Sequence, residues 1–289
     1  MSNEVVEYVT VPDAILWTAR QGTGPPLVLL HGGPGLWDYL AAMAAMIDDL
    51  ATVYRYDQRA CARSLGNTSY TLSEAVADLE RLREHWGVER WVVGGHSWGA
   101  TLGLAYTLLY PQRVRALLYI SGTGIDPTWH ATFHANDATL HDAAEQQQLA
   151  ALKQQIAVAE GEELATLNRH YCELSWSANV ADRSRGREIA RQLFVGDLQP
   201  NYVVNERLSK DGDNFIEADN IPPRLAAVDT PTLVVHGEAD PRAAKYAQQV
   251  AELIPSTRFV VLPNVSHLPW LEQPTLTRQL LRGFLQDQV

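Results

Sequence analysis

One serine of the chain, Ser97, lies in a pattern that can turn a hydroxyl group into a nucleophile. A Gly-x-Ser-x-Gly pattern spans residues 95–99, an apolar run at 91–93 precedes it, and residues 104–109 have the composition of a helix. Between a strand and a helix, this pattern predicts a sharp turn with the serine at its tip. The first N–H groups of the helix favour negative charge near the serine oxygen. A serine that only caps the helix is the alternative interpretation.

A serine hydroxyl needs a base at neutral pH, and the base needs a carboxylate that orients it. In a parallel sheet such groups gather in the loops beyond the carboxyl ends of the strands. Asp240 and His267 each lie in a loop of this kind. The order Ser97, Asp240, His267 along the chain is the order expected for a serine on this type of turn. Asp126, which follows an earlier strand, is the main alternative acid, and Glu238 is a nearby competitor.

Attack of the hydroxyl on a carbonyl group puts negative charge on the carbonyl oxygen, and two fixed backbone N–H groups would stabilise it. One donor is expected to be the N–H of Trp98, the residue after the serine. The other is expected in the loop at 31–35, which reads His-Gly-Gly-Pro-Gly. We choose the N–H of Gly33, because glycines let the backbone of this loop face a substrate. A tight turn that merely requires glycine is the alternative.

Short apolar runs alternate with helical segments along much of the chain. This alternation predicts an α/β fold with a mostly parallel sheet. Continuous apolar runs of strand length indicate strands buried on both faces of the sheet. Besides the strand and helix that flank Ser97, the expected strands are 4–11 and 14–20 (an antiparallel hairpin), 27–30, 52–56, 114–120, 231–237 and 257–262, and the expected helices are 37–50, 71–86, 243–253 and 275–286.

The alternation stops near residue 122 and resumes near residue 228. Between residues 137 and 197 the sequence is rich in Ala, Gln, Glu and Leu, has helical periodicity and contains no convincing strand. We therefore expect residues 1–122 and 228–289 to form the core and residues 123–227 to form a helical cap. Aromatic residues of this insertion are possible walls of a substrate pocket: Trp129, Phe133, Trp176 and Tyr202.

Composition restricts the classes of partner. The net charge of the 289 residues is −11, and no basic cluster occurs, which argues against nucleic acid or an anionic membrane as a partner. Two cysteines, Cys61 and Cys172, cannot form a disulfide framework, and neither has the spacing of a metal site. With no apolar signal segment and no run long enough for a membrane span, a cytoplasmic location is expected. The sequence carries no signal for an oligomeric state.

Several of these segments together resemble the proline iminopeptidases of the α/β-hydrolase superfamily. The resemblance rests on the 31–35 loop, on Asp57-Gln58-Arg59 with Ser64, on residues 94–102 around Ser97, and on the segments that contain Asp240 and His267. It implies an α/β-hydrolase fold with a helical cap. It also implies a serine hydrolase that needs no cofactor or metal and that cleaves a small ester or a peptide bond through an acyl-enzyme.

The resemblance further implies an aminopeptidase acting on a small-molecule or short-peptide substrate, with a cap carboxylate that holds the free amino group. The usual Trp-Glu pair of the family is missing here, so Glu173 and Glu206 are the candidate carboxylates. Ala60 and Ala62 stand where the family usually has glycines. An esterase, lactonase or amide hydrolase is the alternative, and a ligand-sensing receptor on the same fold is a further one.

Overall fold

The structure, a computed structural model, describes residues 4–66, 70–218 and 220–288. Its centre is one sheet with the strand order β1-β2-β4-β3-β6-β7-β8-β9, and the short β5 pairs with β2. Strands β1, β2 and β4 pair antiparallel, whereas β4, β3, β6, β7, β8 and β9 run parallel. The strands are β1 (Val5–Val11), β2 (Ala14–Gln21), β3 (Pro26–Leu30), β4 (Thr52–Tyr56), β5 (Leu65–Gly66), β6 (Trp91–His96), β7 (Val114–Ile120), β8 (Thr232–Gly237) and β9 (Thr257–Leu262).

Helices cover both faces of this sheet, so the central strands are buried on both sides. In β3, Val28 and Leu30 belong to one hydrophobic cluster and Leu27 and Leu29 to the other. This alternation explains why the strand has an uninterrupted apolar sequence. On the Val28 side lie α2 (Leu72–His85), α3 (Trp98–Leu109), α9 (Ile221–Ala226) and α10 (Ala244–Leu253), and on the Leu27 side lie α1 (Ala41–Ala44), α11 (Pro269–Glu272) and α12 (Pro274–Gln286).

The expectation of a helix over residues 37–50 is wrong, because only α1, four residues long, is helical there. The segment before α1 is held by contacts that a continuous helix would not make. Trp37 Nε1 donates to the carbonyl of Leu193, and the backbone N–H of Asp38 donates to Asp57. Turns follow α1 up to residue 50. Tertiary contacts therefore override the helical propensity of this Ala- and Met-rich stretch.

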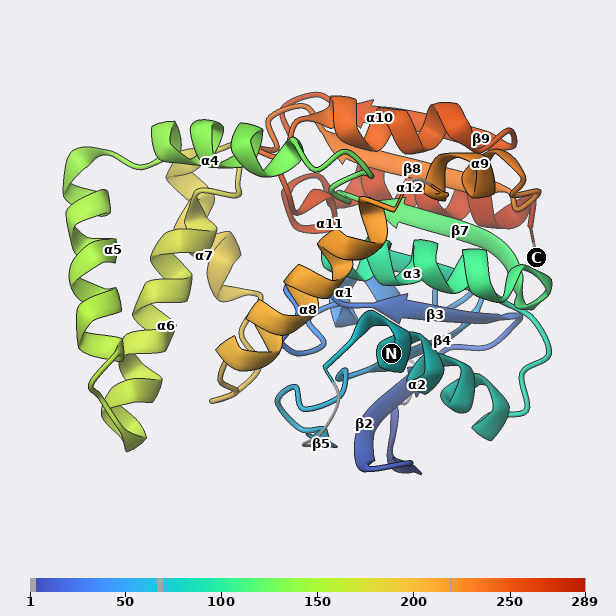
Figure 1. Cartoon of the computed structure of the whole chain (residues 1–289), viewed down its shortest axis with the longest axis horizontal. Helices are drawn as coiled ribbons and strands as arrows, with labels where there is room; N and C mark the ends of the chain where they lie inside the picture. The colour runs from blue at the N-terminus through green and yellow to red at the C-terminus, as the bar shows by residue number, and fades with distance from the viewer. Residues whose placement is uncertain (1–3, 67–69, 219, 289) are drawn as a thin grey trace.

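Residues 123–227 contain helices and, in the part that the structure describes, no strand. Asp142 begins one of these helices with a capping box: its side chain accepts from the backbone N–H of Glu145, and the Glu145 side chain accepts from the backbone N–H of Asp142. Figure 1 shows most of these helices extending to one side of the sheet, with α8 crossing in front of it. They are α4 (Trp129–Leu140), α5 (Ala143–Ile156), α6 (Gly161–Ser177), α7 (Gly186–Arg191) and α8 (Tyr202–Ile216). The boundaries of a core and a cap remain a prediction.

Two short 3₁₀ helices occur as well: Pro111–Arg113 before β7 and Arg183–Arg185 before α7. Across the described residues, no helix has the length and apolar character needed to cross a bilayer.

The segment after β4 is a compact turn that contains Ala60 and Ala62. Both alanines have positive φ angles, 56° and 44°, a backbone region that glycine tolerates far better. Polar contacts hold the turn in place: Ser64 Oγ donates to the carbonyl of Asp57 at 2.6 Å, and Arg63 Nε donates to the Asp57 carboxylate at 2.6 Å. Alanine therefore keeps a conformation here that glycine would adopt with less strain.

Candidate active site

Ser97 occupies a tight connection between β6 and α3. Its φ is 56° and its ψ is −124°, a combination that residues with a Cβ rarely adopt. A Cβ at Gly95 would lie 2.0 Å from the carbonyl oxygen of Gly99, and one at Gly99 would lie 2.1 Å from the carbonyl oxygen of Leu30. The turn therefore requires both glycines, and it presents Ser97 at its tip, as the Gly-x-Ser-x-Gly pattern predicts.

His267 and Asp240 meet beyond the carboxyl ends of β8 and β9. The distance from His267 Nδ1 to Asp240 Oδ2 is 2.6 Å, and both side chains are buried. The two alternative acids lie elsewhere: Asp126 accepts hydrogen bonds from Thr128, and Glu238 is exposed. His267 and Ser97 line one and the same cavity. The structure thus pairs the predicted base with the predicted acid, and it places the base in the wall of a cavity that the predicted nucleophile also lines.

Both titratable partners of this pair have shifted pKa values. Burial and the charge of Arg242 lower the pKa of His267 to about 4, although Asp240 acts in the opposite direction. Burial alone would raise the pKa of Asp240, but His267, Arg242 and His236 together hold it well below its usual range. At neutral pH the pair is therefore a neutral imidazole whose Nδ1–H donates to a carboxylate, which leaves Nε2 able to accept a proton.

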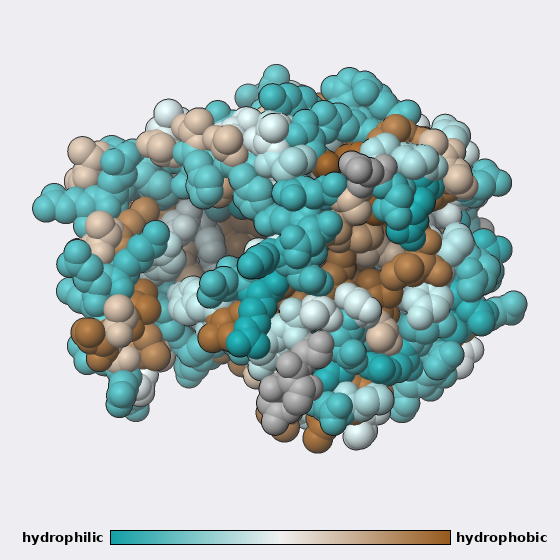
Figure 2. Space-filling view, in the orientation of Figure 1, coloured by the Kyte–Doolittle hydropathy of each residue, from teal (hydrophilic) through white to brown (hydrophobic). Residues whose placement is uncertain are grey.

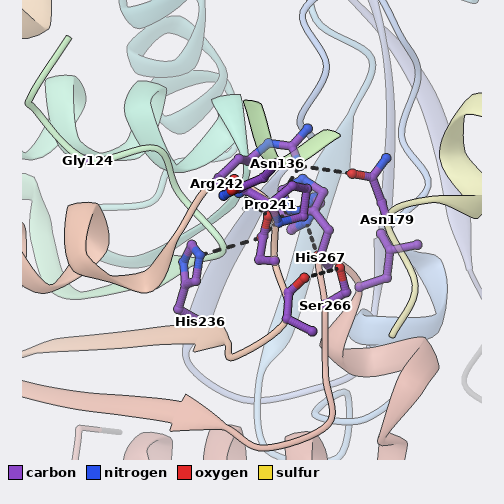
Figure 3. A network of polar contacts seen from close by, with 12 residues as sticks. Gly124, Asn136, Asn179, His236, Pro241, Arg242, Ser266 and His267 are labelled. Atoms are coloured by element: carbon purple, nitrogen blue, oxygen red, sulfur yellow. Dashed lines mark hydrogen bonds and ion pairs between the residues drawn. The ribbon is translucent and has the colours of Figure 1, made fainter. Parts of the chain in front are cut away.

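Two further residues contact Asp240, namely Arg242 and His236, both labelled in Figure 3. The Arg242 backbone N–H donates to Asp240 Oδ1 at 3.0 Å, and its Nη1 lies 3.3 Å from the same oxygen. Nη1 also donates to Oδ1 of Asn179, at 3.0 Å, in the segment after α6. His236 Nε2 lies 3.6 Å from Asp240 Oδ2, and His236 is fully buried. Hydrogen bonds with His267 and Arg242 therefore fix Asp240, and His236 packs beside it without a hydrogen bond.

The two amides that we expect to bind an oxyanion lie next to Ser97. Trp98 is the first residue of α3, where an N–H has no carbonyl one turn earlier in the helix. Gly33 lines both cavities at Ser97 and has a φ of 53°. A Cβ at the neighbouring Gly32 would lie 2.6 Å from the Cβ of Ser97. The 31–35 loop thus passes directly beside the serine.

A chain of hydrogen bonds connects this loop to the backbone of His267. The N–H of Gly32 donates to the Tyr39 hydroxyl at 2.8 Å, and that hydroxyl donates to His96 Nδ1 at 2.7 Å. His96 Nε2 donates to the carbonyl of His267 at 2.9 Å. Burial, assisted by His267, lowers the pKa of His96 well below its ordinary value, which agrees with a neutral ring in this relay.

Comparison with known proteins agrees with this geometry. The family described as "alpha/beta hydrolase fold" matches residues 25–274. The chain belongs to this α/β-hydrolase family. It is 26% identical to a proline iminopeptidase of Heyndrickxia coagulans over 93% of each chain, and 27% identical to one of Saccharolobus solfataricus over 93% of this chain and 87% of the relative. The fold resembles an alpha/beta hydrolase of Bacillus anthracis, at a TM-score of 0.75, 17% identity and 99% coverage of each chain. It also resembles a proline iminopeptidase of Mycobacterium smegmatis, at a TM-score of 0.68, 22% identity and 98% coverage.

This α/β hydrolase has a cavity of about 280 Å³ beside Ser97, between α3, α4 and α8. Figure 2 shows the surface hollowed next to α8, with hydrophobic residues deeper in the hollow. Gly212 lets α8 approach α3, since a Cβ there would lie 3.2 Å from Nε1 of Trp98. Most of the lining surface is apolar, although about half of the lining residues have polar side chains: Ser97, Thr101, Thr123, His130, Asn205, Ser209, Asp213 and Arg242.

A second, smaller cavity of about 100 Å³ lies on the other side of Ser97. Ser97, Gly33 and Arg242 line both cavities, whereas His267 lines only the smaller one. The remaining walls of the smaller cavity come from the core and from the segments around α6 and α7: Leu36, Tyr39, His96, Trp176, Asn179, Leu193 and Leu268. The site of this hydrolase thus has two compartments that meet at the serine.

The two carboxylates predicted to hold an amino group do not lie in either cavity, and that prediction needs correction. Glu173 pairs with Arg191 at 2.5 Å, and Glu206 is exposed on α8. The carboxylate that lines the larger cavity is Asp213, which lies about two helical turns after Glu206 on the same side of α8. Its Oδ1 lies 2.8 Å from His130 Nε2 of α4.

Asp213, His130 and Arg242 were not among the site residues that the sequence predicts. A helical pattern indicates which face of α8 is apolar, but it does not indicate which polar residue faces a neighbouring helix across a cavity. For Arg242 a signal was present, because it follows Asp240 by two residues in the same loop. Of the four possible wall aromatics, Trp129 and Phe133 line the larger cavity and Trp176 the smaller one, while Tyr202 is exposed. Among the described residues, no group of three or more His, Cys, Asp or Glu side chains is arranged to hold a metal ion.

Proposed function

We propose that this hydrolase cleaves a small amide or ester bond through an acyl-enzyme, with Ser97 as the nucleophile. His267 Nε2 takes the proton of the Ser97 hydroxyl as its oxygen attacks the substrate carbonyl, and the new C–O bond forms. The N–H groups of Gly33 and Trp98 hold the resulting oxyanion. His267 then gives the proton to the leaving group as its bond to carbon breaks. Water, activated by the same imidazole, releases the acid from Ser97. Asp240 keeps His267 in the required tautomer.

We further propose that the substrate is a small peptide or amino-acid amide with a free amino terminus, so that the enzyme is an aminopeptidase of the proline iminopeptidase type. The observation that carries this proposal is the Asp213 carboxylate in the cavity beside Ser97. A protonated amine enters a largely apolar cavity at low cost only where it meets an opposite charge. Asp213 Oδ2 has no partner among the described residues, while Oδ1 faces His130. Trp129, Phe133 and Ile216 offer an apolar wall for the side chain of the first residue.

The similarity to proline iminopeptidases supports the same substrate class, although those relatives are no more than about a quarter identical over the full length. Asp213 would take the role that the sequence assigned to Glu173 or Glu206.

The test compares proline p-nitroanilide with its N-acetyl derivative. The wild-type enzyme is expected to prefer the free amine by roughly 10- to 100-fold in kcat/KM, the range of one or two charge-assisted hydrogen bonds. Asp213→Asn is expected to reduce that ratio toward one, because the amide cannot pair with an ammonium group. Glu206→Gln, at an exposed position of the same helix that lines neither cavity, is the matched control and keeps the wild-type ratio.

The second candidate is an esterase, lactonase or amide hydrolase, which the apolar wall of the larger cavity favours, because such a wall fits an acyl group without charge. Turnover of short-chain p-nitrophenyl esters together with equal rates on the free and acetylated anilides would select this candidate. No turnover of any substrate, combined with thermal stabilisation by a bound ligand, would select a receptor instead.

A further inference from the structure

Arg242 is a charged group at the junction of the two cavities, and the proposed mechanism leaves part of it unused. Its side chain is largely buried, with 15% of its surface exposed. Nη1 contacts Asn179 and Asp240, whereas Nε and Nη2 have no partner among the described residues. Its Cζ lies 4.6 Å from the centre of the Phe133 ring. The guanidinium is thus held in one orientation by Phe133, Asn179 and Asp240, with donors left over beside Ser97.

The position of His267 indicates which cavity takes the leaving group. In the proposed mechanism the imidazole gives its proton to the leaving group, so that group must lie against His267. His267 lines the smaller cavity and does not line the larger one. The acyl part, with its amino group at Asp213, then occupies the larger cavity. The leaving group occupies the smaller one, between Asn179, Arg242 and Leu268.

The size of the smaller cavity limits the leaving group. A volume of about 100 Å³ has room for little more than one amino-acid residue. When the leaving group is a single residue, it carries a carboxylate at its own end. The guanidinium of Arg242 is the cation in the lining of this cavity, and a planar guanidinium pairs with a carboxylate in a fixed geometry.

We infer that Arg242 binds the terminal carboxylate of the leaving residue, so that the preferred substrates are dipeptides with both ends free. This inference rests on the proposed aminopeptidase function. The ammonium group of the dipeptide faces Asp213, its peptide carbonyl lies at Ser97, and its carboxylate faces Arg242. Hydrolysis adds one water and releases two amino acids, and it needs no other reactant.

The experiment uses three substrates at pH 7: the dipeptide Pro-Ala, its C-terminal amide Pro-Ala-NH₂, and proline p-nitroanilide. The released proline or p-nitroaniline is quantified for each. The wild-type enzyme is expected to cleave Pro-Ala at least about tenfold faster, in kcat/KM, than the amide, because only the dipeptide offers a charged acceptor to Arg242.

Two substitutions at Arg242 and one control complete the design. Arg242→Gln is expected to bring the ratio of Pro-Ala to Pro-Ala-NH₂ close to one, and Arg242→Lys, which retains the charge, is expected to keep part of it. The ratio is the readout because Arg242 also contacts Asp240, so absolute rates will fall with every substrate. Arg258→Gln, at an exposed position of β9, removes the same charge and keeps the wild-type ratio. Thermal unfolding of each variant verifies that it is folded.

The outcomes separate the two proposals. A wild-type ratio near one, with cleavage of proline p-nitroanilide intact, overturns the role of Arg242 and leaves the aminopeptidase standing. An unchanged ratio in Arg242→Gln does the same. Cleavage of p-nitrophenyl esters without cleavage of any of the three free-amine substrates overturns both proposals.

Discussion

The two regions that surround the site, the carboxyl edge of the sheet and the pair of helices α4 and α8, hold their side chains very differently. At the sheet edge, Asp240 is buried and has contacts from His267, Arg242 and His236. On the helices, the Asp213 side chain is 29% exposed and its His130 partner 38% exposed, and one contact joins them. Both regions border the same serine.

This difference corresponds to two kinds of task. Bond making and breaking require atoms held close to a fixed geometry, which buried and multiply bonded groups provide. Binding of a substrate requires complementary charge and shape at a surface that the substrate can reach. We therefore expect changes at the sheet edge to affect all substrates alike, and changes on α4 and α8 to discriminate among them. Substitution of Ser97 or Asp240 tests the first half of that expectation, and substitution of Asp213 tests the second. Arg242 belongs to the sheet edge but also lines both cavities, so its substitution is expected to lower all rates and to change the substrate ratio as well.

The largest effect is expected for Ser97→Ala. Loss of the nucleophile should reduce kcat about 10⁶-fold with anilides and with esters alike. A fluorophosphonate probe should label the wild-type protein and fail to label this variant. Labelling that persists in Ser97→Ala would mean that another residue is the nucleophile.

A smaller but still large effect is expected for Asp240→Asn. An amide at this position favours the wrong tautomer of His267, which should reduce kcat by about 10⁴-fold for every substrate. Asp126→Asn is the matched control, since Asp126 contacts Thr128 and Gln249 rather than His267, and its activity should equal that of the wild type. Were Asp126→Asn the inactive variant, the acid of the site would have to be reassigned.

The smallest effect is expected in the pH profile. The enzyme works with neutral His267, whose pKa is about 4, so kcat/KM should stay constant from neutral pH downwards and fall only as the pH approaches 4. Arg242→Gln removes one cause of the lowered pKa, and the acid limb should move upwards by up to about one pH unit. A p-nitrophenyl ester is the substrate of choice, because it does not titrate in this range. An acid limb near pH 6.5 in the wild-type enzyme would contradict the buried, neutral imidazole.

Patterns that are local along the chain could be read from the sequence. Gly95 and Gly99 indicate the turn at Ser97 in the sequence, because neighbouring backbone atoms lie too close to both residues to leave room for a Cβ. The loops of Asp240 and His267 could be predicted from the apolar strands before them. The helix over 37–50 was predicted wrongly, because contacts of Trp37 and Asp38 with distant residues decide that segment.

The substrate side of the site could not be read in the same way. Asp213 and Glu206 are both acidic residues of α8, and only the packing of α8 against α3 and α4 decides which of them faces the cavity. Glu173 likewise pairs with Arg191, a partner 18 residues away that helical periodicity does not reveal. Motifs predicted the α/β-hydrolase fold because they are local, whereas the charges offered to a substrate arise from the packing of separate helices.

The positive φ of Ser97 has a consequence for how robust the protein is. A residue with a side chain in such a conformation stores roughly 1–3 kcal/mol of strain, and glycine would adopt the same backbone with less. A descendant of this chain that no longer needed the hydroxyl could therefore gain thermal resilience from one change to glycine. Retaining serine at that point means accepting a less durable fold in exchange for reactivity.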